Sequence, residues 1–273
     1  MPYPRAHYYV LLCMAVIVAG FWPSYFAQWG SVPWQFHAHG VAASIWVMMV
    51  AAQSWSVHNK QLPLHRAVGK SSLLLFPFLI GGLFAIIDVT GKGFVGGDFI
   101  RTTFGGEFLI GLGLAVAAYV LLFYRALKHR RKVWLHSGYM LATPLILFES
   151  PLSRILGTWI PALRYNGPQD NHLFMDSILW AMAVELAVIA VLWWRFRDKA
   201  APFLVAALFI VAQMLTMGLM HKNAVLESLL VVIGNLPSAA VVAAGFALGS
   251  ATSWAGWKAG KRPVIPARMV PAE

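Results

Sequence analysis

The chain has 273 residues, of which 59% are hydrophobic and only 11% are charged, whereas about 25% are charged in an average soluble domain. Apolar runs recur along the whole length, which is typical of a polytopic membrane protein. The net charge of +11 would suggest nucleic acid as a partner of a soluble protein, but here the cations crowd into loops beside the apolar runs, which excludes that class.

Eight apolar stretches are each long enough to cross a bilayer as a helix, because about 20 residues at 1.5 Å each cover roughly 30 Å of hydrocarbon. We therefore expect an all-α integral membrane bundle. The spans are expected at 8–24, 36–57, 68–89, 106–125, 134–156, 173–194, 201–220 and 226–250. Residues 1–257 would form one transmembrane domain. Residues 258–273, with three prolines and four cations, would form a disordered basic tail bound to the lipid surface.

Lysine and arginine are divided unequally between the two sides of this arrangement. With the N-terminus inside, the inner segments hold 16 cations and the outer segments hold 5. Positive charge collects on the cytoplasmic side of membrane proteins. We therefore expect both termini to be cytoplasmic and the chain to cross the bacterial inner membrane several times.

Several features interrupt the apolar pattern. The glycine-rich stretch 90–106 lacks the spacing of a phosphate-binding loop and is expected to be a flexible connector. Pro144 and Pro237 are expected to kink the spans that contain them. Glu185 lies near the middle of the span 173–194, where a carboxylate is costly unless it is protonated or paired.

Histidines at the cation-rich side are candidate cofactor ligands, namely His58, His65 and His136. His65 and His136 each lie near the first turn of a helix, where the helix dipole favours a neutral imidazole that can bind a metal. Two such helices could hold a b-type haem or a copper ion between them. The alternative is that both histidines only anchor their helices at the headgroups. His7 and His129 are expected to be solvated interfacial residues.

A second set of candidates lies at the outer side. His37 and His39 are two residues apart, so they face different sides of a helix, and we expect His39, the deeper one, to face the bundle. With Glu149 and Asp176, His39 would form a nitrogen and oxygen metal site or a proton-handling cluster. Glu149 is expected to have a partner besides Arg154, because their five-residue spacing suits an intrahelical pair poorly. The alternative is a set of unlinked polar residues near the interface.

The sequence FHAHG begins the second expected span, LHRAVGK begins the third, and WLHSGYMLAT follows a second basic loop. This combination resembles uncharacterised bacterial multi-pass membrane protein families, which carry a His-x-His motif, a His-Arg-x-x-Gly loop and a later His-x-x-x-Met motif. The resemblance covers about residues 36–150. It implies no settled activity, although related small members are associated with respiratory-oxidase assembly. Ser137 departs from the pattern, because many members have a basic residue there.

Three functions agree with these patterns. The leading hypothesis is a membrane protein that holds haem or copper through histidines at span ends, for electron transfer or respiratory-complex assembly. One alternative is a non-catalytic accessory subunit, with no cofactor, that packs against a larger membrane complex through its small residues. Another is a transporter in which Glu149, Glu185 and the kink at Pro237 line a path. No hydrolase motif identifies an enzyme.

Overall fold

The structure, a computed structural model, describes residues 2–261. This part of the chain is 85% helical and contains no strand, which confirms the all-α class. Six of its helices are long and apolar enough to cross a membrane. They are α2 (Trp34–His58), α3 (Leu62–Val95), α4 (Phe99–Lys128), α7 (Asn171–Phe196), α8 (Ala201–Leu219) and α10 (Ser238–Ala259).

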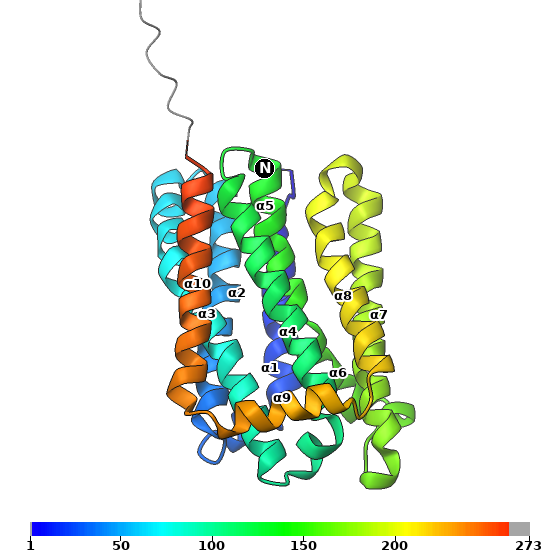
Figure 1. Cartoon of the computed structure of the whole chain (residues 1–273). Helices are drawn as coiled ribbons and strands as arrows, with labels where there is room; N and C mark the ends of the chain where they lie inside the picture. The colour runs from blue at the N-terminus through cyan, green and yellow to red at the C-terminus, as the bar shows by residue number, and fades with distance from the viewer. Residues whose placement is uncertain (1, 262–273) are drawn as a thin grey trace, which may run out of the picture.

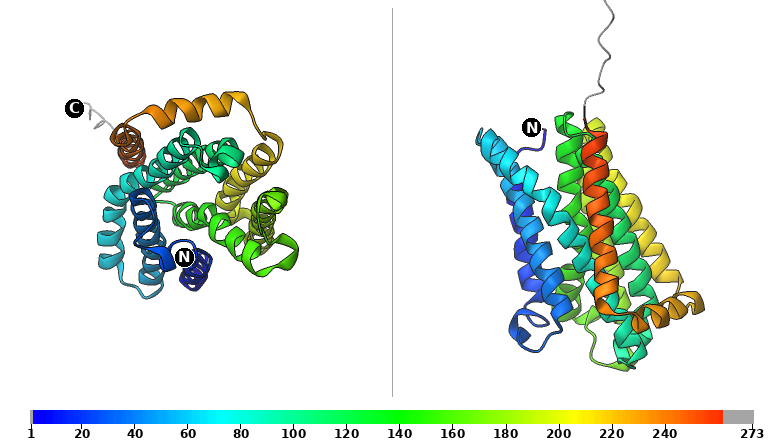
Figure 2. Two further views of the ribbon diagram at one scale, coloured as in Figure 1. Left: turned by 90° about the horizontal axis from the view of Figure 1, so that it is seen from below. Right: turned by 60° about the vertical axis from the view of Figure 1, so that its left-hand side comes forward.

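Shorter helices complete the bundle. The helix α1 and the pair α5–α6 run alongside the long helices, whereas α9 crosses one end of the bundle (Figure 1). Their bounds are α1 (Ala6–Phe21), α5 (Val133–Ala142), α6 (Glu149–Trp159) and α9 (Ala224–Asn235). Figure 2 shows α9 running along the outside of the bundle from the end of α8 to the start of α10.

The prediction of one span over 226–250 is wrong, because α9 and α10 are separate helices. Leu236 between them is extended, with φ −77° and ψ 151°. Pro237 causes the break, since it has no N–H to donate within a helix and it disfavours the helical conformation of the residue before it. The sequence signal at Pro237 therefore marks a turn between two helices rather than a kink.

The prediction of a flexible connector over 90–106 is also wrong. Helix α3 continues to Val95 and α4 begins at Phe99, so the turn contains only residues 96–98. Gly97 adopts a left-handed conformation with φ 75°, and the Asp98 carboxylate accepts a hydrogen bond from the Arg101 N–H at 3.0 Å. A glycine turn followed by an N-cap starts a helix immediately.

The predicted kink at Pro144 is present as a 3₁₀ segment, Thr143–Leu147, between α5 and α6. Two buried side chains hold this break in place. The Tyr119 hydroxyl donates to the Thr143 carbonyl at 2.8 Å, and the Trp46 Nε1–H donates to the Thr143 hydroxyl at 2.9 Å. Irregular backbone at membrane depth needs partners of this kind.

Both ends of the described chain lie at the same end of the bundle (Figure 1). The turns α2–α3, α4–α5 and α7–α8 lie there too, and they contain or adjoin the cations assigned to the inner side, so we call it the cation-rich end. The predicted boundary after residue 257 falls inside α10, which ends at Ala259. The rest of the predicted tail, from residue 262, lies outside the described residues.

Candidate functional site

A cavity of about 430 Å³ lies at the cation-rich end, and His65 of α3 and His136 of α5 both line it. Most of its wall is apolar, with Val50 from α2 and Met140 from α5 among the lining residues. This volume falls in the range of about 300–1,000 Å³ that is usual for cofactor and small-molecule sites. The two histidines of the haem or copper hypothesis therefore share one pocket.

The ring of His136 is held in one orientation by helix α4. Its Nδ1 lies 2.9 Å from the carbonyl oxygen of Ala126. A carbonyl only accepts hydrogen bonds, so Nδ1 carries the proton and Nε2 keeps a free lone pair. Histidines that bind metals are usually oriented by a hydrogen bond of this type.

The ring of His65 has a free nitrogen in the same pocket. Its Nδ1 is buried and makes no hydrogen bond to any described residue. The backbone carbonyl of His65 accepts a hydrogen bond from the Gln53 side chain at 3.1 Å, which ties the start of α3 to α2. The backbone at His65 is thus tied to α2, and its imidazole has a buried nitrogen without a partner in the described chain.

Three cations, Arg66, Lys70 and Arg130, line the same cavity. The Arg130 guanidinium stacks over the Trp257 ring at 4.3 Å and donates to the Trp257 carbonyl at 2.9 Å. Guanidinium and ammonium groups at the mouth of an apolar pocket suit a ligand with an apolar body and an anionic edge.

His58 is not among the residues that line this cavity. Its Nδ1 donates to the Ser54 carbonyl at 2.7 Å, and its ring centre lies 5.7 Å from that of His7. The expectation that His7 is solvated is wrong, since only 8% of it is exposed. The Tyr3 hydroxyl, bonded to the Lys199 carbonyl at 2.7 Å, holds the start of the chain against the bundle. No local sequence signal reveals this contact between distant residues.

At the opposite end, His37 belongs to an aromatic cluster formed with the α1–α2 loop. The Tyr25 hydroxyl lies 2.9 Å from His37 Nδ1, and the Trp29 ring packs 4.4 Å from the imidazole. Burial raises the pKa of Tyr25, so its hydroxyl stays protonated, and it donates to or accepts from His37 Nδ1 according to the imidazole tautomer. These contacts give His37 a structural role in closing the loop.

His39 lies on the other side of α2, next to Arg154 of α6, and its Nδ1 is buried without a partner among residues 2–261. Arg154 also interacts electrostatically with Glu149, and its guanidinium donates a hydrogen bond to the Ser150 carbonyl at 2.8 Å. No hydrogen bond or ion pair in the described chain joins Asp176 to this group. The described residues contain no group of three or more His, Cys, Asp or Glu that could hold a metal ion.

Glu185 of α7 is a buried acid whose nearest hydrogen-bonding group is the backbone N–H of Glu149. Only 1% of it is exposed, and its Oε1 makes no hydrogen bond within the described chain. Its neighbours Cys13, Tyr119 and Glu149 come from α1, α4 and α6, and none of them is a cation. An unpaired carboxylate is costly at membrane depth, so we expect a neutral carboxyl group here.

Two other buried acids have partners that sequence analysis did not identify. Glu107 pairs with His221 at 2.5 Å. Asp88 pairs with Lys92 at 3.2 Å and accepts a hydrogen bond from Gln35 at 3.1 Å. Only the Asp88–Lys92 pair has a signal in the sequence, which is its four-residue spacing.

Comparison of the chain with protein-family models, curated proteins and solved structures finds no match. The resemblance of residues 36–150 to bacterial multi-pass families therefore stays a prediction, and function is inferred from the site.

Proposed function

We propose that this protein crosses the bacterial inner membrane eight times, with both termini in the cytoplasm, and binds one b-type haem at the cytoplasmic side. The spans would be α1, the six long helices and the combined α5–α6 segment. His65 and His136 would hold its iron. The bound haem would serve electron transfer or respiratory-complex assembly.

One observation carries the proposal, namely that two imidazoles with free nitrogens line one apolar cavity whose wall also holds three cations. Haem matches each part of this lining. Its iron takes axial imidazole ligands, its macrocycle is apolar, and its two propionates are anionic. Arg66 and Arg130 would pair with the propionates.

Copper fits the same residues less well. Copper sites usually combine several nitrogen or sulfur ligands. The cavity lining holds two histidines and two methionines, Met49 and Met140, and no cysteine. These side chains could ligate copper, but the cations of the lining would repel a copper ion and would pair with the propionates of haem, so haem agrees better with the lining.

The test is the absorption spectrum of the purified protein, oxidised and reduced, from cells supplied with a haem precursor. We expect a Soret band that shifts on reduction. The variants H65A and H136A should each lose bound haem by at least tenfold, because loss of a ligand costs at least as much as loss of a group that supports one.

The matched control is H129A. His129 lies in the α4–α5 turn, at the same end of the bundle, but it does not line the cavity. H129A should therefore keep the wild-type spectrum. A colourless wild-type protein, or H65A and H136A variants with unchanged spectra, would contradict haem binding. If the purified protein contains stoichiometric copper and no iron, the ligand of this pocket is copper and not haem.

A transporter is the second candidate, and Glu185 is the observation that favours it. Buried, unpaired acids within spans often belong to ion or proton pathways. Reconstituted protein should then conduct protons or a proton-coupled solute across liposomes, and E185Q should abolish the flux. Equal flux in wild type and E185Q would show that Glu185 is not part of a transport pathway.

A further inference from the structure

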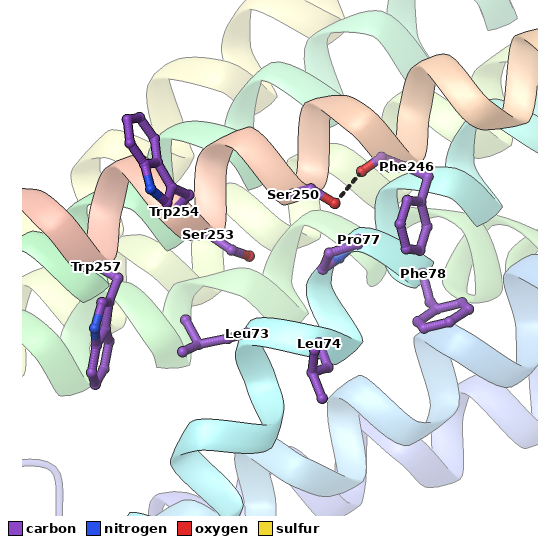
Figure 3. A pocket seen from close by; sticks show the side chains of 9 residues that line it. All are labelled: Leu73, Leu74, Pro77, Phe78, Phe246, Ser250, Ser253, Trp254 and Trp257. Atoms are coloured by element: carbon purple, nitrogen blue, oxygen red, sulfur yellow. Dashed lines mark hydrogen bonds between the residues drawn. The ribbon is translucent and has the colours of Figure 1, made fainter.

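A groove of about 440 Å³ runs along the outer surface between α3 and α10 (Figure 3). Its walls are almost entirely apolar and include Leu74, Pro77 and Phe78 of α3, and Phe246 and Trp254 of α10. In a membrane this surface faces the lipid, so a lipid molecule is the ligand that can reach the groove.

The groove has the length of one leaflet. It extends along α10 from Trp257 to Phe246, which are 11 residues apart. At 1.5 Å per residue this span is about 16 Å, close to half of the roughly 30 Å hydrocarbon thickness. The groove begins near the cation-rich end, so it matches one acyl chain of the leaflet on that side.

One polar group in the groove has no protein partner. Ser253 is only 6% exposed, and its hydroxyl makes no hydrogen bond within residues 2–261. Ser250, one turn away, instead donates to the Phe246 carbonyl at 2.8 Å (Figure 3). A buried hydroxyl without a partner is unfavourable. An acyl chain alone would leave it unpaired, whereas an ester oxygen would accept its hydrogen bond.

Cations gather at the end of the groove near Trp257. Lys258 lies 4.9 Å from the centre of the Trp254 ring, and Arg130 stacks on Trp257. Lys70 lies one turn before Leu74 on α3, at the same end. Cations from α3, from the α4–α5 turn and from α10 thus lie near the end of the groove where a lipid phosphate would be.

We propose that this groove is a binding site for an anionic phospholipid of the cation-rich leaflet. One acyl chain lies between α3 and α10, an ester oxygen accepts a hydrogen bond from Ser253, and the headgroup lies near Lys70 and Lys258. The groove is on the lipid-facing surface, and haem binding in the neighbouring cavity is not required for it.

The experiment is native mass spectrometry of the full chain in detergent, with added phosphatidylglycerol or phosphatidylcholine. Wild type should retain one phosphatidylglycerol and much less phosphatidylcholine. The variant K70Q/K258Q should bind phosphatidylglycerol more weakly by about fivefold for each cation removed, the usual contribution of a basic residue at an anionic membrane. The control R195Q/K199Q removes two cations at the same end, away from the groove, and should bind as wild type does.

Two further variants test the groove itself. S250W fills it and should abolish retention, while S253A removes the hydroxyl and should lower retention several-fold without disturbing the fold. Equal retention of the two lipids would overturn the anionic preference. Unchanged retention in S253A, together with equal losses in K70Q/K258Q and the control, would overturn the site. If S250W does not fold, S253A and the charge variants decide.

Discussion

Glu185 differs from the other buried acids in having no cation beside it. Asp88 and Glu107 are as deeply buried, at 0% and 1% exposure, but Lys92 and His221 pair with them. The free energy of a buried ion depends on its partner, and removing one member of a pair leaves the other uncompensated. The two kinds of acid should therefore respond differently to neutralisation.

We predict that E185Q changes the free energy of unfolding by less than about 1 kcal/mol, because a neutral amide replaces a neutral carboxyl of the same shape. The matched change D88N should cost about 2 kcal/mol, since Lys92 and Gln35 lose a charged acceptor. Chemical unfolding in mixed micelles measures both. If E185Q is as damaging as D88N, Glu185 is ionised and has a partner in the membrane.

Individual residues were predictable where local helix position decides their environment. His65 and His136 occupy equivalent first-turn positions, and their shared cavity follows from two helices starting at one end of the bundle. Helical geometry separates His39 from His37, and the two residues lie on different sides of α2 with different neighbours. His7 was predicted to be solvated, but it packs beside His58 at the end of α2. No local pattern in the sequence indicates this contact between distant residues.

At the scale of elements, α9 is held at both ends by polar contacts. The Asn223 side chain accepts hydrogen bonds from the Val225 and Leu226 N–H groups at 3.0 and 3.2 Å. At its other end, the Lys92 ammonium donates to the Leu236 carbonyl at 2.8 Å. A cap at the N-terminus and a cation at the C-terminus both stabilise a helix. These contacts keep α9 across the end of the bundle.

We predict that N223A destabilises α9 by about 1 kcal/mol, the usual cost of removing an N-cap side chain. Hydrogen exchange should become faster in α9 and stay unchanged in α10. The control is S228A, which removes a hydroxyl that only bonds to Ala224 within α9. Faster exchange throughout the bundle, or none in α9, would show that the cap does not anchor this helix.

The long helices were predictable because about 20 apolar residues leave few alternatives to a membrane span. The connections were not. The stretch 90–106 contains enough glycine to suggest a loop, yet Asp98 caps α4 and most of the stretch is helical. The stretch 226–250 has the apolarity of one span, but the position of α9 depends on Lys92, which is 142 residues away in sequence from Gly234, one of its partners.

For the whole molecule, the distribution of cations favours one orientation in the membrane. The turns at the cation-rich end, together with the helix ends beside them, hold most of the lysines and arginines of the described chain, and positive charge favours the cytoplasmic side. The same orientation would place the cavity with His65 and His136 toward the cytoplasm and the His37 loop toward the outside.

We predict that single-cysteine labelling will show this orientation. The labelling is done in a C13S background, since Cys13 is the only native cysteine. A cysteine replacing Asn166, in the α6–α7 loop, should react with a membrane-impermeant maleimide in spheroplasts. A cysteine replacing Arg131, in the α4–α5 turn, should react only after the membrane is disrupted. Labelling of both positions in intact spheroplasts, or of Arg131→Cys alone, would reverse or refute the orientation.

The central claim is that the cavity between His65 and His136 holds one haem. Its most direct test is the iron and haem content of gently purified wild-type protein, measured per chain together with copper. We expect one iron and one extractable b-type haem per chain, with no copper. Protein that is folded and monodisperse but contains neither iron nor haem, even after incubation with free haem, would contradict it.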